Sequence, residues 1–289
     1  MKKVRIVAPA KNIEEVHIDN AKQFLREKGF EVEIGTYTLG KHHYFSGTIA
    51  ERLSDFQFAL DDPSIDIILC ARGGYGSVQL IDQLDFTKFK ENPKLIVGYS
   101  DITVFHNHVP KHYNLPTVHA TAPLNFSENT PEALDSFLNS LLGRSNTYHI
   151  APTEWNVEGE VTAPLIGGNL AILHSLLGTN SDADYQDKIL FVEEIGEAIY
   201  AVDRMFYAFE KAGKLKQIKG LIVGGMTNMK DSEIPYGMGV EEVILRHVSN
   251  YQIPVCFNFP AGHISDNRAL IIGQQASLNV GPGGVTFEQ

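Results

Sequence analysis

The sequence predicts an α/β protein with two domains, the first built on a parallel sheet. In the first half, short apolar strands alternate with helical patterns, which is typical of a parallel sheet with helices on both faces. One predicted strand, Ile65 to Cys70, is apolar throughout, as expected for a strand buried on both faces. The 289 residues suffice for two medium domains. The alternation becomes less regular in the second half, so we expect a separate α/β or α+β domain there.

Composition and charge exclude several classes of protein. The chain is 43% apolar and 20% charged, which is ordinary for a globular protein. Its formal charge of −11, without a Lys/Arg cluster, argues against nucleic-acid binding. No apolar run is long enough for a membrane span or a signal-peptide core. Cys70 and Cys256 stand in apolar surroundings without a C-x-x-C partner, so we expect buried thiols in a reducing compartment, the cytoplasm.

The first half contains five predicted strands. The helix at 13–28 has apolar residues on one face and ends before Gly29, a common C-cap. A second helix, at 47–59, carries Ile49, Leu53, Phe56 and Ala59 on one face. Strands are expected at 4–8, 30–34, 65–70, 95–97 and, as a weak edge strand, 117–118, with further helices at 78–84 and after Ser100.

A linker and a mixed second half follow. Residues 125–160 hold a helix at 132–142 and a polar stretch with the only tryptophan, Trp155. Beyond them we expect helices at 170–177, 199–212 and 240–248, strands at 189–192 and 220–223, an extended segment at 254–257 and a terminal hairpin of 269–272 with 276–280. The predicted division is therefore 1–124, 125–160 and 161–289.

Ser100 lies where a nucleophile would be displayed. It follows an apolar strand and Gly98-Tyr99, and a helical pattern comes after it, which is the layout of a nucleophile elbow. The full G-x-S-x-G pattern is not met, because Ile102 stands where the second glycine belongs. The alternative is that Ser100 or Asp101 merely caps the helix.

A glycine-rich turn, Arg72 to Ser77, follows the neighbouring strand. It matches neither a Walker A motif nor a dinucleotide fingerprint. It could be a plain tight turn, a phosphate cradle or an oxyanion hole. The last use requires a nucleophile nearby, and Ser100 is one strand away.

Two acidic residues and a histidine could complete an acyl-transfer site. Glu193 and Glu194 end an apolar strand, and because neighbouring side chains on a strand point to opposite faces, only one can face a given site. The alternative is a solvated acidic loop. His263 lies on a loop that leaves an apolar segment, where it could instead be an ordinary hydrogen-bonded histidine. With Ser100, these residues would make a Ser–Glu–His constellation.

Several long motifs resemble those of a known protein family. ARGGYGSVQLIDQLDF, PKLIVGYSDIT, PLIGGNLAILHSLLGT, ILFVEEIGEAIYAVDRMF and FPAGH occur in this order. They resemble the LD-carboxypeptidase, or muramoyltetrapeptide carboxypeptidase, family of serine peptidases, which also includes microcin C immunity proteins. The resemblance implies an N-terminal domain akin to class I glutamine amidotransferases and a smaller β-rich C-terminal domain. One departure is Ile49-Ala50, where the family would have an acidic residue after Gly-Thr.

The resemblance also implies a site and an activity. The triad would be Ser100, Glu193 and His263, with Glu193 preferred to Glu194. The oxyanion hole would use N–H groups of Asp101 and of Gly73 or Gly74. The implied protein is a cytoplasmic homodimer, without cofactor, metal, nucleic acid or membrane as partner. Further substrate-binding candidates are Arg72, Tyr99, Trp155 and Arg204, with Arg268 as another cation.

The implied reaction releases terminal D-alanine from the muramyl tetrapeptide of peptidoglycan. Two other readings stay open at this point. One is a peptidyl-adenylate hydrolase of the microcin immunity type, which Trp155 could serve as an aromatic recognition residue. The other is a non-catalytic α/β ligand-binding protein in which Ser100 only caps a helix.

Overall fold

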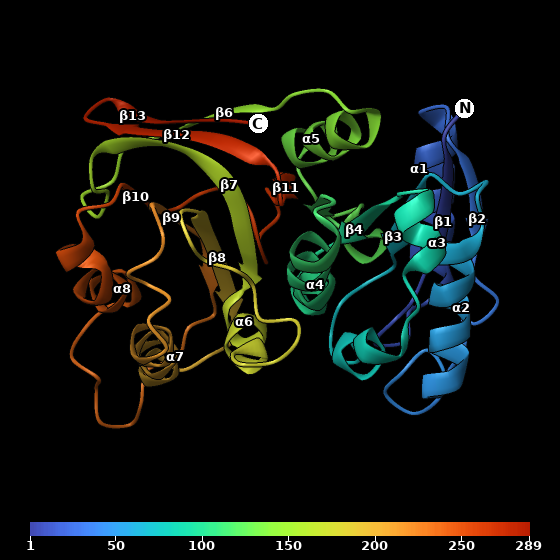
Figure 1. Cartoon of the computed structure of the whole chain (residues 1–289), viewed down its shortest axis with the longest axis horizontal. Helices are drawn as coiled ribbons and strands as arrows, with labels where there is room; N and C mark the ends of the chain where they lie inside the picture. The colour runs from blue at the N-terminus through green and yellow to red at the C-terminus, as the bar shows by residue number, and fades with distance from the viewer.

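The computed structural model describes all 289 residues and has two sheets with flanking helices, which together form two lobes (Figure 1). The first half of the chain, blue to green, builds the lobe on the right, and the second half, yellow to red, builds most of the lobe on the left. None of its helices combines the length and the apolar character that crossing a membrane requires.

The first sheet has six strands, of which five are parallel, as the alternating pattern predicted. The sixth, β11, comes from the end of the chain and pairs antiparallel with β5. In sheet order the strands are β11 (Leu270–Ile272), β5 (Thr117–His119), β4 (Leu95–Gly98), β3 (Ile67–Cys70), β1 (Lys3–Val7) and β2 (Glu31–Ile34).

Helices cover both faces of this sheet. Strand β3 shows why, because Ile67 and Leu69 belong to the hydrophobic core on one face, and Ile68 and Cys70 to the core on the other. The apolar run predicted to be buried on both faces is therefore confirmed. One face carries α1 (Glu15–Glu27) and α5 (Pro131–Leu142), and the other α2 (Ile49–Asp61), α3 (Thr87–Glu91) and α4 (Thr103–Tyr113).

The second sheet has seven strands and is half parallel, half antiparallel. Its strands β7 to β10 run parallel, whereas β12, β13 and β6 pair antiparallel. In sheet order they are β10 (Val255–Cys256), β9 (Gly220–Thr227), β8 (Ile189–Ile195), β7 (Gly159–Asn169), β12 (Gln275–Gly281), β13 (Gly284–Glu288) and β6 (Thr147–Ile150).

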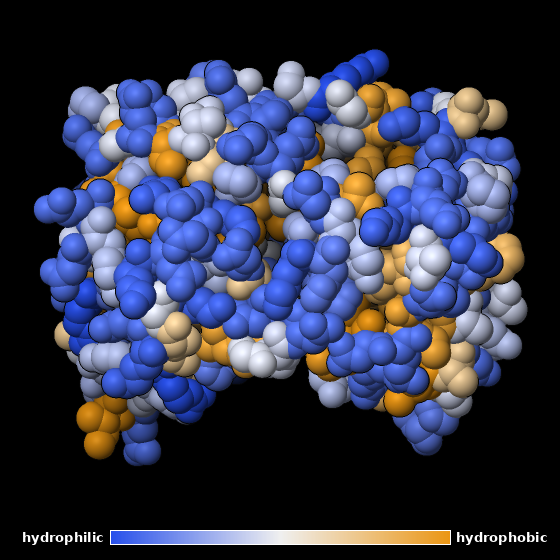
Figure 2. Space-filling model, viewed as in Figure 1, coloured by the Kyte–Doolittle hydropathy of each residue, from blue (hydrophilic) through white to orange (hydrophobic).

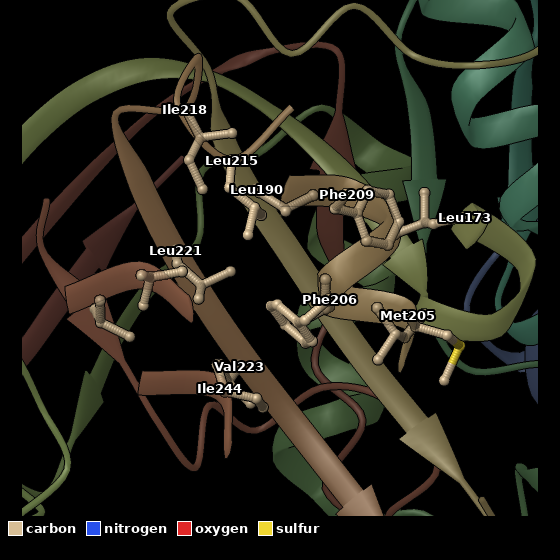
Figure 3. Close-up of a cluster of buried hydrophobic side chains, with 14 of the residues drawn as sticks. Leu173, Leu190, Met205, Phe206, Phe209, Leu215, Ile218, Leu221, Val223 and Ile244 are labelled. Carbon is tan, nitrogen blue, oxygen red and sulfur yellow. The ribbon is translucent and has the colours of Figure 1, made fainter. Parts of the chain in front are cut away.

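Three helices pack on one face of the second sheet: α6 (Leu170–Leu176), α7 (Ile199–Lys211) and α8 (Val240–Val248). Figure 3 shows the resulting core, in which Leu190 and Leu221 of the strands meet Phe206 of α7 and Ile244 of α8. The next residue of β8, Phe191, points into a separate core on the opposite face. Burial on both faces accounts for the unbroken apolar run at the start of this strand.

Two predictions near the sheets are wrong, and a third stretch contains a strand that was not predicted. Residues 78–84 do not form an α-helix but parts of two 3₁₀ turns, Ser77–Gln79 and Ile81–Gln83. Strand β5 is not an edge strand, because β11 pairs with its free side. The stretch predicted as a polar linker contains β6, which pairs with β13 at the edge of the second sheet.

The terminal hairpin was also predicted incorrectly. Residues 270–272 and 275–281 belong to different sheets, and the hairpin is formed by β12 and β13. Residues 163–169, read only as the approach to a helix, are the end of the long strand β7. Apolar periodicity identifies a strand but not its pairing partner, which depends on long-range contacts.

The surface is mostly hydrophilic, with small scattered hydrophobic areas and a notch between the lobes at the lower edge of the view (Figure 2). Both cysteines are free and buried, as their apolar surroundings predicted.

Candidate active site

Ser100 is displayed at the carboxyl end of β4 in an uncommon conformation. Its φ is +65°, in the left-handed region, and it opens a 3₁₀ turn that leads into α4. Non-glycine residues occupy this region rarely, and often at functional sites. Neither Ser100 nor Asp101 caps α4 with its side chain, so the capping alternative is wrong. The geometry is that of the predicted strand–turn–helix elbow.

The glycine-rich turn lies directly against Ser100. A Cβ on Gly73 would come within 2.7 Å of Ser100 Cβ and 3.0 Å of Ser100 Oγ. The same Cβ would be 3.1 Å from the Asp101 nitrogen, so only glycine allows this approach. Gly74 faces Lys11 and Tyr44 instead. Of the two glycines predicted to contribute to the oxyanion hole, Gly73 therefore lies closer to Ser100 than Gly74 does.

Asp101 ties the glycine-rich turn to the elbow. Its Oδ2 accepts a hydrogen bond of 2.8 Å from the Ser77 N–H. Burial raises the pKa of this carboxyl, while the hydrogen bonds from Ser77 and the charge of Arg52 act in the opposite direction. Arg52 in turn donates to the Pro9 and Gly76 carbonyls at 2.7 and 3.3 Å. Buried polar contacts thus fix the turn that carries Gly73.

A bulge between β8 and β9 shapes the environment of Glu193. The pairing register shifts between Val192 and Glu194, and Gly224 lies opposite, where its Cβ would be 3.3 Å from Glu193 Cβ. The N–H of Gly225 leaves the ladder and donates to the Ala261 carbonyl at 2.9 Å. The bulge therefore brings the segment before His263 alongside Glu193.

Glu193 and His263 form a buried hydrogen-bonded pair. The Nδ1 of His263 lies 2.7 Å from Glu193 Oε2, which also accepts the His263 backbone N–H at 3.2 Å. Since a carboxylate only accepts, the neutral imidazole carries its proton on Nδ1 and leaves Nε2 as a base. Burial alone lowers the pKa of His263, but the charge and hydrogen bond of Glu193 and the charge of Glu194 raise it above its ordinary value.

Glu194 points away from His263. Its carboxylate accepts from Asn169 Nδ2 at 3.1 Å and from the Ala171 and Ile195 N–H groups at 2.7 and 2.8 Å. Burial raises the pKa of this carboxyl. Glu193 and Glu194 are 0% and 3% exposed, so the alternative of a solvated acidic loop is wrong. The prediction that only one of them can face a given site agrees with this geometry.

Two further contacts hold the His263 loop, and sequence reasoning missed both. Gly262 has φ +111°, and a Cβ there would be 2.7 Å from Glu193 Oε2. Thr227, at the end of β9, donates its hydroxyl to the His263 carbonyl at 3.0 Å. The only sequence signal for Thr227 was its place just after the strand and the Gly224-Gly225 pair.

The structure brings the Glu193–His263 pair close to the segment that carries Ser100. The ring of Tyr99, which precedes Ser100, lies 4.9 Å from the ring of His263, centroid to centroid. No hydrogen bond joins Ser100 Oγ to His263, and catalytic contacts are often loose without substrate. His263 and Tyr99 line a pocket to which Asn125, Glu128 and Asn129 also contribute, a segment with no sequence signal.

The remaining substrate-binding candidates lie in different places. Arg72 is half-buried beside Gly73 and donates one N–H to the Asn12 carbonyl at 3.1 Å. Arg204 is exposed on α7 beside Tyr200, and Arg268 is paired with Asp266. Trp155 packs against the core under α7 and α8 and does not line the pocket.

The fold and the site define a two-sheet α/β protein in which a hydrogen-bonded Glu–His pair lies near a serine elbow. Profiles of the LD-carboxypeptidase N-terminal and C-terminal domains match residues 4–120 and 162–278. A relative from Bacillus subtilis, named a probable murein peptide carboxypeptidase, is 31% identical over 96% of this chain and 88% of its own length. The chain therefore belongs to the LD-carboxypeptidase family, as the motifs predicted.

Two other comparisons place this chain among related structures and sequences. The crystal structure of a muramoyltetrapeptide carboxypeptidase from Oxalobacter formigenes matches with a TM-score of 0.91 and 28% identity, over 99% of this chain and 98% of that one. A microcin self-immunity protein from Escherichia coli is 26% identical over 89% of this chain and 83% of its own length. Both branches named in the predicted resemblance are thus represented.

Proposed function

We propose that this protein is a serine carboxypeptidase that hydrolyses the L,D amide bond releasing terminal D-alanine from muramyl tetrapeptide, in cytoplasmic peptidoglycan recycling. The observation that carries the proposal is the His263–Glu193 hydrogen bond beside a left-handed Ser100, in a chain of the LD-carboxypeptidase family. The names of the Bacillus and Oxalobacter relatives support the choice of substrate.

In the first half of the reaction, Ser100 Oγ attacks the scissile carbonyl carbon while His263 Nε2 takes the hydroxyl proton. Glu193 holds the imidazole through Nδ1 and stabilises its charged form. The N–H groups of Asp101 and Gly73, or of Gly74 in its place, receive the oxyanion. His263 then gives its proton to the amide nitrogen, the C–N bond breaks, and D-alanine leaves.

In the second half, a water molecule attacks the acyl ester of Ser100. His263 takes a proton from the water, and the second tetrahedral intermediate collapses. The C–O bond to Ser100 breaks and the serine oxygen regains the proton, which releases the tripeptide. The net reaction consumes one water per amide bond and requires no metal, which fits the serine-type mechanism that we propose.

Arg72 is the cation we propose for the terminal carboxylate of the substrate. It lies next to Gly73 and so on the glycine-rich side of Ser100, and only one of its N–H groups is engaged, by the Asn12 carbonyl. Its Nε is buried without a partner. A guanidinium with free donors suits a carboxylate.

Three broader features complete the proposal. We propose a homodimer, on the family resemblance. We also propose domains at 1–124 and 161–289 joined by 125–160. The N-terminal domain is proposed to be akin to class I glutamine amidotransferases, supported by its parallel strands and the serine elbow after β4.

One assay tests the function. The protein is incubated with muramyl tetrapeptide and, separately, with a peptidyl-adenylate analogue, each with and without EDTA. We expect D-alanine release that survives EDTA and disappears in Ser100→Ala. Cleavage of the adenylate alone would move the assignment to the microcin immunity role of the Escherichia coli relative. A folded protein that cleaves neither substrate would favour a ligand-binding protein.

A further inference from the structure

One buried arginine joins three loops at the carboxyl edge of the first sheet. Arg52 lies near the start of α2 and is only 2% exposed. Its guanidinium donates to backbone carbonyls of the segments that follow β1, precede α2 and follow β3, which are those of Pro9, Gly47 and Gly76 at 2.7, 3.1 and 3.3 Å. A fourth bond, of 2.6 Å, goes to Gln79 Oε1. Because apolar residues can often replace buried charges without loss of stability, stability alone does not account for this arginine.

The bond to Gly76 is one half of a clamp on a single peptide unit. The carbonyl of the Gly76–Ser77 peptide accepts from Arg52 Nη1. The N–H of the same peptide donates to Asp101 Oδ2 at 2.8 Å, and the Asp101 side chain is buried. A trans peptide points its carbonyl and its N–H in opposite directions, so the guanidinium and the carboxyl hold this peptide from opposite sides. We refer to this arrangement as the peptide clamp.

The clamp fixes the far end of the glycine-rich turn. The near end is fixed by the Ala71 N–H, which donates to a carbonyl of β1 at 2.8 Å. Between the two ends lie Gly73 and Gly74, and a glycine backbone has more conformational freedom than that of any other residue. With both ends held, the turn keeps the conformation in which Gly73 lies against Ser100 and the Asp101 nitrogen.

From this arrangement we infer that Arg52 and the Asp101 side chain are positioning residues for the reaction, because the peptide clamp aims the Gly73 N–H at the developing oxyanion. The inference rests on the proposed serine mechanism and extends it to an arginine that has no hydrogen bond with any residue of the triad. Asp101 then serves twice: its backbone N–H is one oxyanion donor, and its carboxyl fixes the turn that supplies the other. The clamp leaves the base His263 untouched, so its loss should slow the attack on the carbonyl without moving the pH dependence.

The test uses an alkyl fluorophosphonate, which reacts with an activated serine and needs no muropeptide. Ser100 Oγ bonds to phosphorus, the P–F bond breaks and fluoride leaves, while His263 takes the hydroxyl proton. The phosphonyl oxygen takes the place of the oxyanion and receives the same N–H groups. The rate constant of phosphonylation therefore measures the oxyanion hole without depending on the substrate.

Arg52→Lys removes one half of the clamp but keeps the charge. A lysine ammonium lacks the planar fork that reaches several carbonyls at once. We expect the second-order rate constant for phosphonylation to fall roughly a hundredfold, as for a misplacement of about 1 Å. The matched control is Arg5→Lys, at a buried arginine of β1 that pairs with Glu33 and Asp55 and has no bond to the glycine-rich turn. Its rate constant should equal that of the wild type, even if urea unfolding shows a similar loss of stability.

Two substitutions of Asp101 test the other half of the clamp. Asp101→Ala removes the acceptor of the Ser77 N–H and keeps the backbone N–H at position 101, so we again expect a loss of roughly a hundredfold. Asp101→Asn offers an amide oxygen to the same N–H and should recover roughly tenfold of that loss. Since both halves hold one peptide, Arg52→Lys combined with Asp101→Ala should be about as slow as the slower single variant.

The outcomes separate the clamp from general damage and from the proposed substrate. For each folded variant, the pH profile of phosphonylation should keep the wild-type acid limb, which reports His263. Wild-type rate constants in Arg52→Lys and Asp101→Ala, or an equal loss in Arg5→Lys, would overturn the inference. If Arg52→Lys does not fold, the comparison of Asp101→Ala with Asp101→Asn decides. A wild type that is not phosphonylated at Ser100 would overturn the clamp together with the serine mechanism, whereas phosphonylation without release of D-alanine would overturn only the substrate assignment.

Discussion

At the scale of single residues, the adjacent carboxylates of Glu193 and Glu194 have different surroundings. Glu193 accepts two hydrogen bonds from His263, and its Oε1 has no partner. Glu194 is satisfied by Asn169 and by backbone N–H groups at the start of α6. Alternation along β8 and the bulge opposite Glu193 produce this separation. Their substitutions should therefore have different effects.

The first prediction concerns this pair. Glu193→Gln should lower kcat about 10³- to 10⁴-fold, because a neutral amide neither fixes the Nδ1–H tautomer nor stabilises the imidazolium. Glu194→Gln should instead lower the free energy of unfolding by about 1–3 kcal/mol, since it weakens buried bonds at the α6 end, with kcat largely kept. Steady-state kinetics and urea unfolding of both variants measure the contrast. Equal losses of kcat would contradict the assignment of Glu193.

The second prediction is a pH dependence. His263 must be neutral to act as a base, and its pKa is raised by Glu193, so kcat/KM should fall as the pH drops through a value above 6.5. Glu194 contributes to this rise, so Glu194→Gln should move the acid limb to lower pH. For stability the sign is opposite: the His263 contribution is full below pH 6.5 and is lost as the pH rises through its folded pKa. If the pH profile of kcat/KM fell only below pH 6.5, the assignment of His263 as the general base would be refuted.

At the scale of elements, glycines decide how closely loops and strands approach the site. Gly73 allows the turn after β3 to touch Ser100, and Gly262 allows the loop after β10 to close over Glu193. In the PLIGGN motif, a Cβ on Gly168 would be 2.4 Å from Thr103 Oγ1. Thr103 Oγ1 accepts the Asn169 N–H at 2.9 Å, and Asn169 Oδ1 caps α6. This motif packs the second lobe against α4, and none of its residues is among the proposed catalytic residues.

The third prediction tests one of these approaches. Gly262→Ala combines a left-handed backbone with a clash against Glu193, so it should cost at least about 2–3 kcal/mol of unfolding free energy and reduce kcat strongly. Gly143→Ala is the matched control: its φ is also positive, at +71°, but nothing lies within 4 Å of the added methyl. That variant should lose only about 1 kcal/mol and keep its kcat. Similar kcat values for the two variants would argue against a role of Gly262 in positioning His263.

At the scale of the whole molecule, the two lobes are joined by a strand from the second half of the chain that belongs to the first sheet. Strand β11, from the second half, completes the first sheet beside β5. Next to that junction, the ring of His119 is buried between Tyr99 and Phe191, and neither ring nitrogen has a hydrogen-bond partner. His106 is also buried and contacts Thr117 Oγ1 and the Gly98 carbonyl. Both histidines are held neutral where the sheet meets the second lobe.

The fourth prediction follows from these buried histidines. Burial lowers the pKa of His106 to about 4 and that of His119 well below 6.5. Because the unfolded chain binds protons more readily, their contribution to stability is full above pH 6.5 and is lost as the pH falls. The free energy of unfolding should drop by about 3 kcal/mol between pH 7 and 4 through His106 alone.

Denaturant unfolding at several pH values checks this loss. His106→Gln should be less stable than wild type at pH 7 but should lose about 3 kcal/mol less on acidification. His149→Gln, a change at an exposed histidine of β6, should follow the wild-type curve. Parallel curves for wild type and His106→Gln would show that His106 does not titrate on unfolding.

Local patterns in the sequence determined much of this protein. The parallel first sheet, the helix after Ser100 and the burial of both cysteines follow from apolar runs and glycine positions. The family motifs singled out Ser100, Glu193 and His263. Sequence patterns could predict these features because backbone geometry and burial restrict which residue types can occupy neighbouring positions in a strand, a helix or a tight turn.

Only the tertiary structure decided which distant groups meet. It placed 270–272 in the first sheet, and it set Gly73 rather than Gly74 against Ser100. It also brought Glu128 to the pocket beside His263, although no pattern around residue 128 indicated a site. The physical reason is that strand pairing, bulges and loop approach depend on contacts between residues tens to more than a hundred positions apart, which local periodicity does not encode.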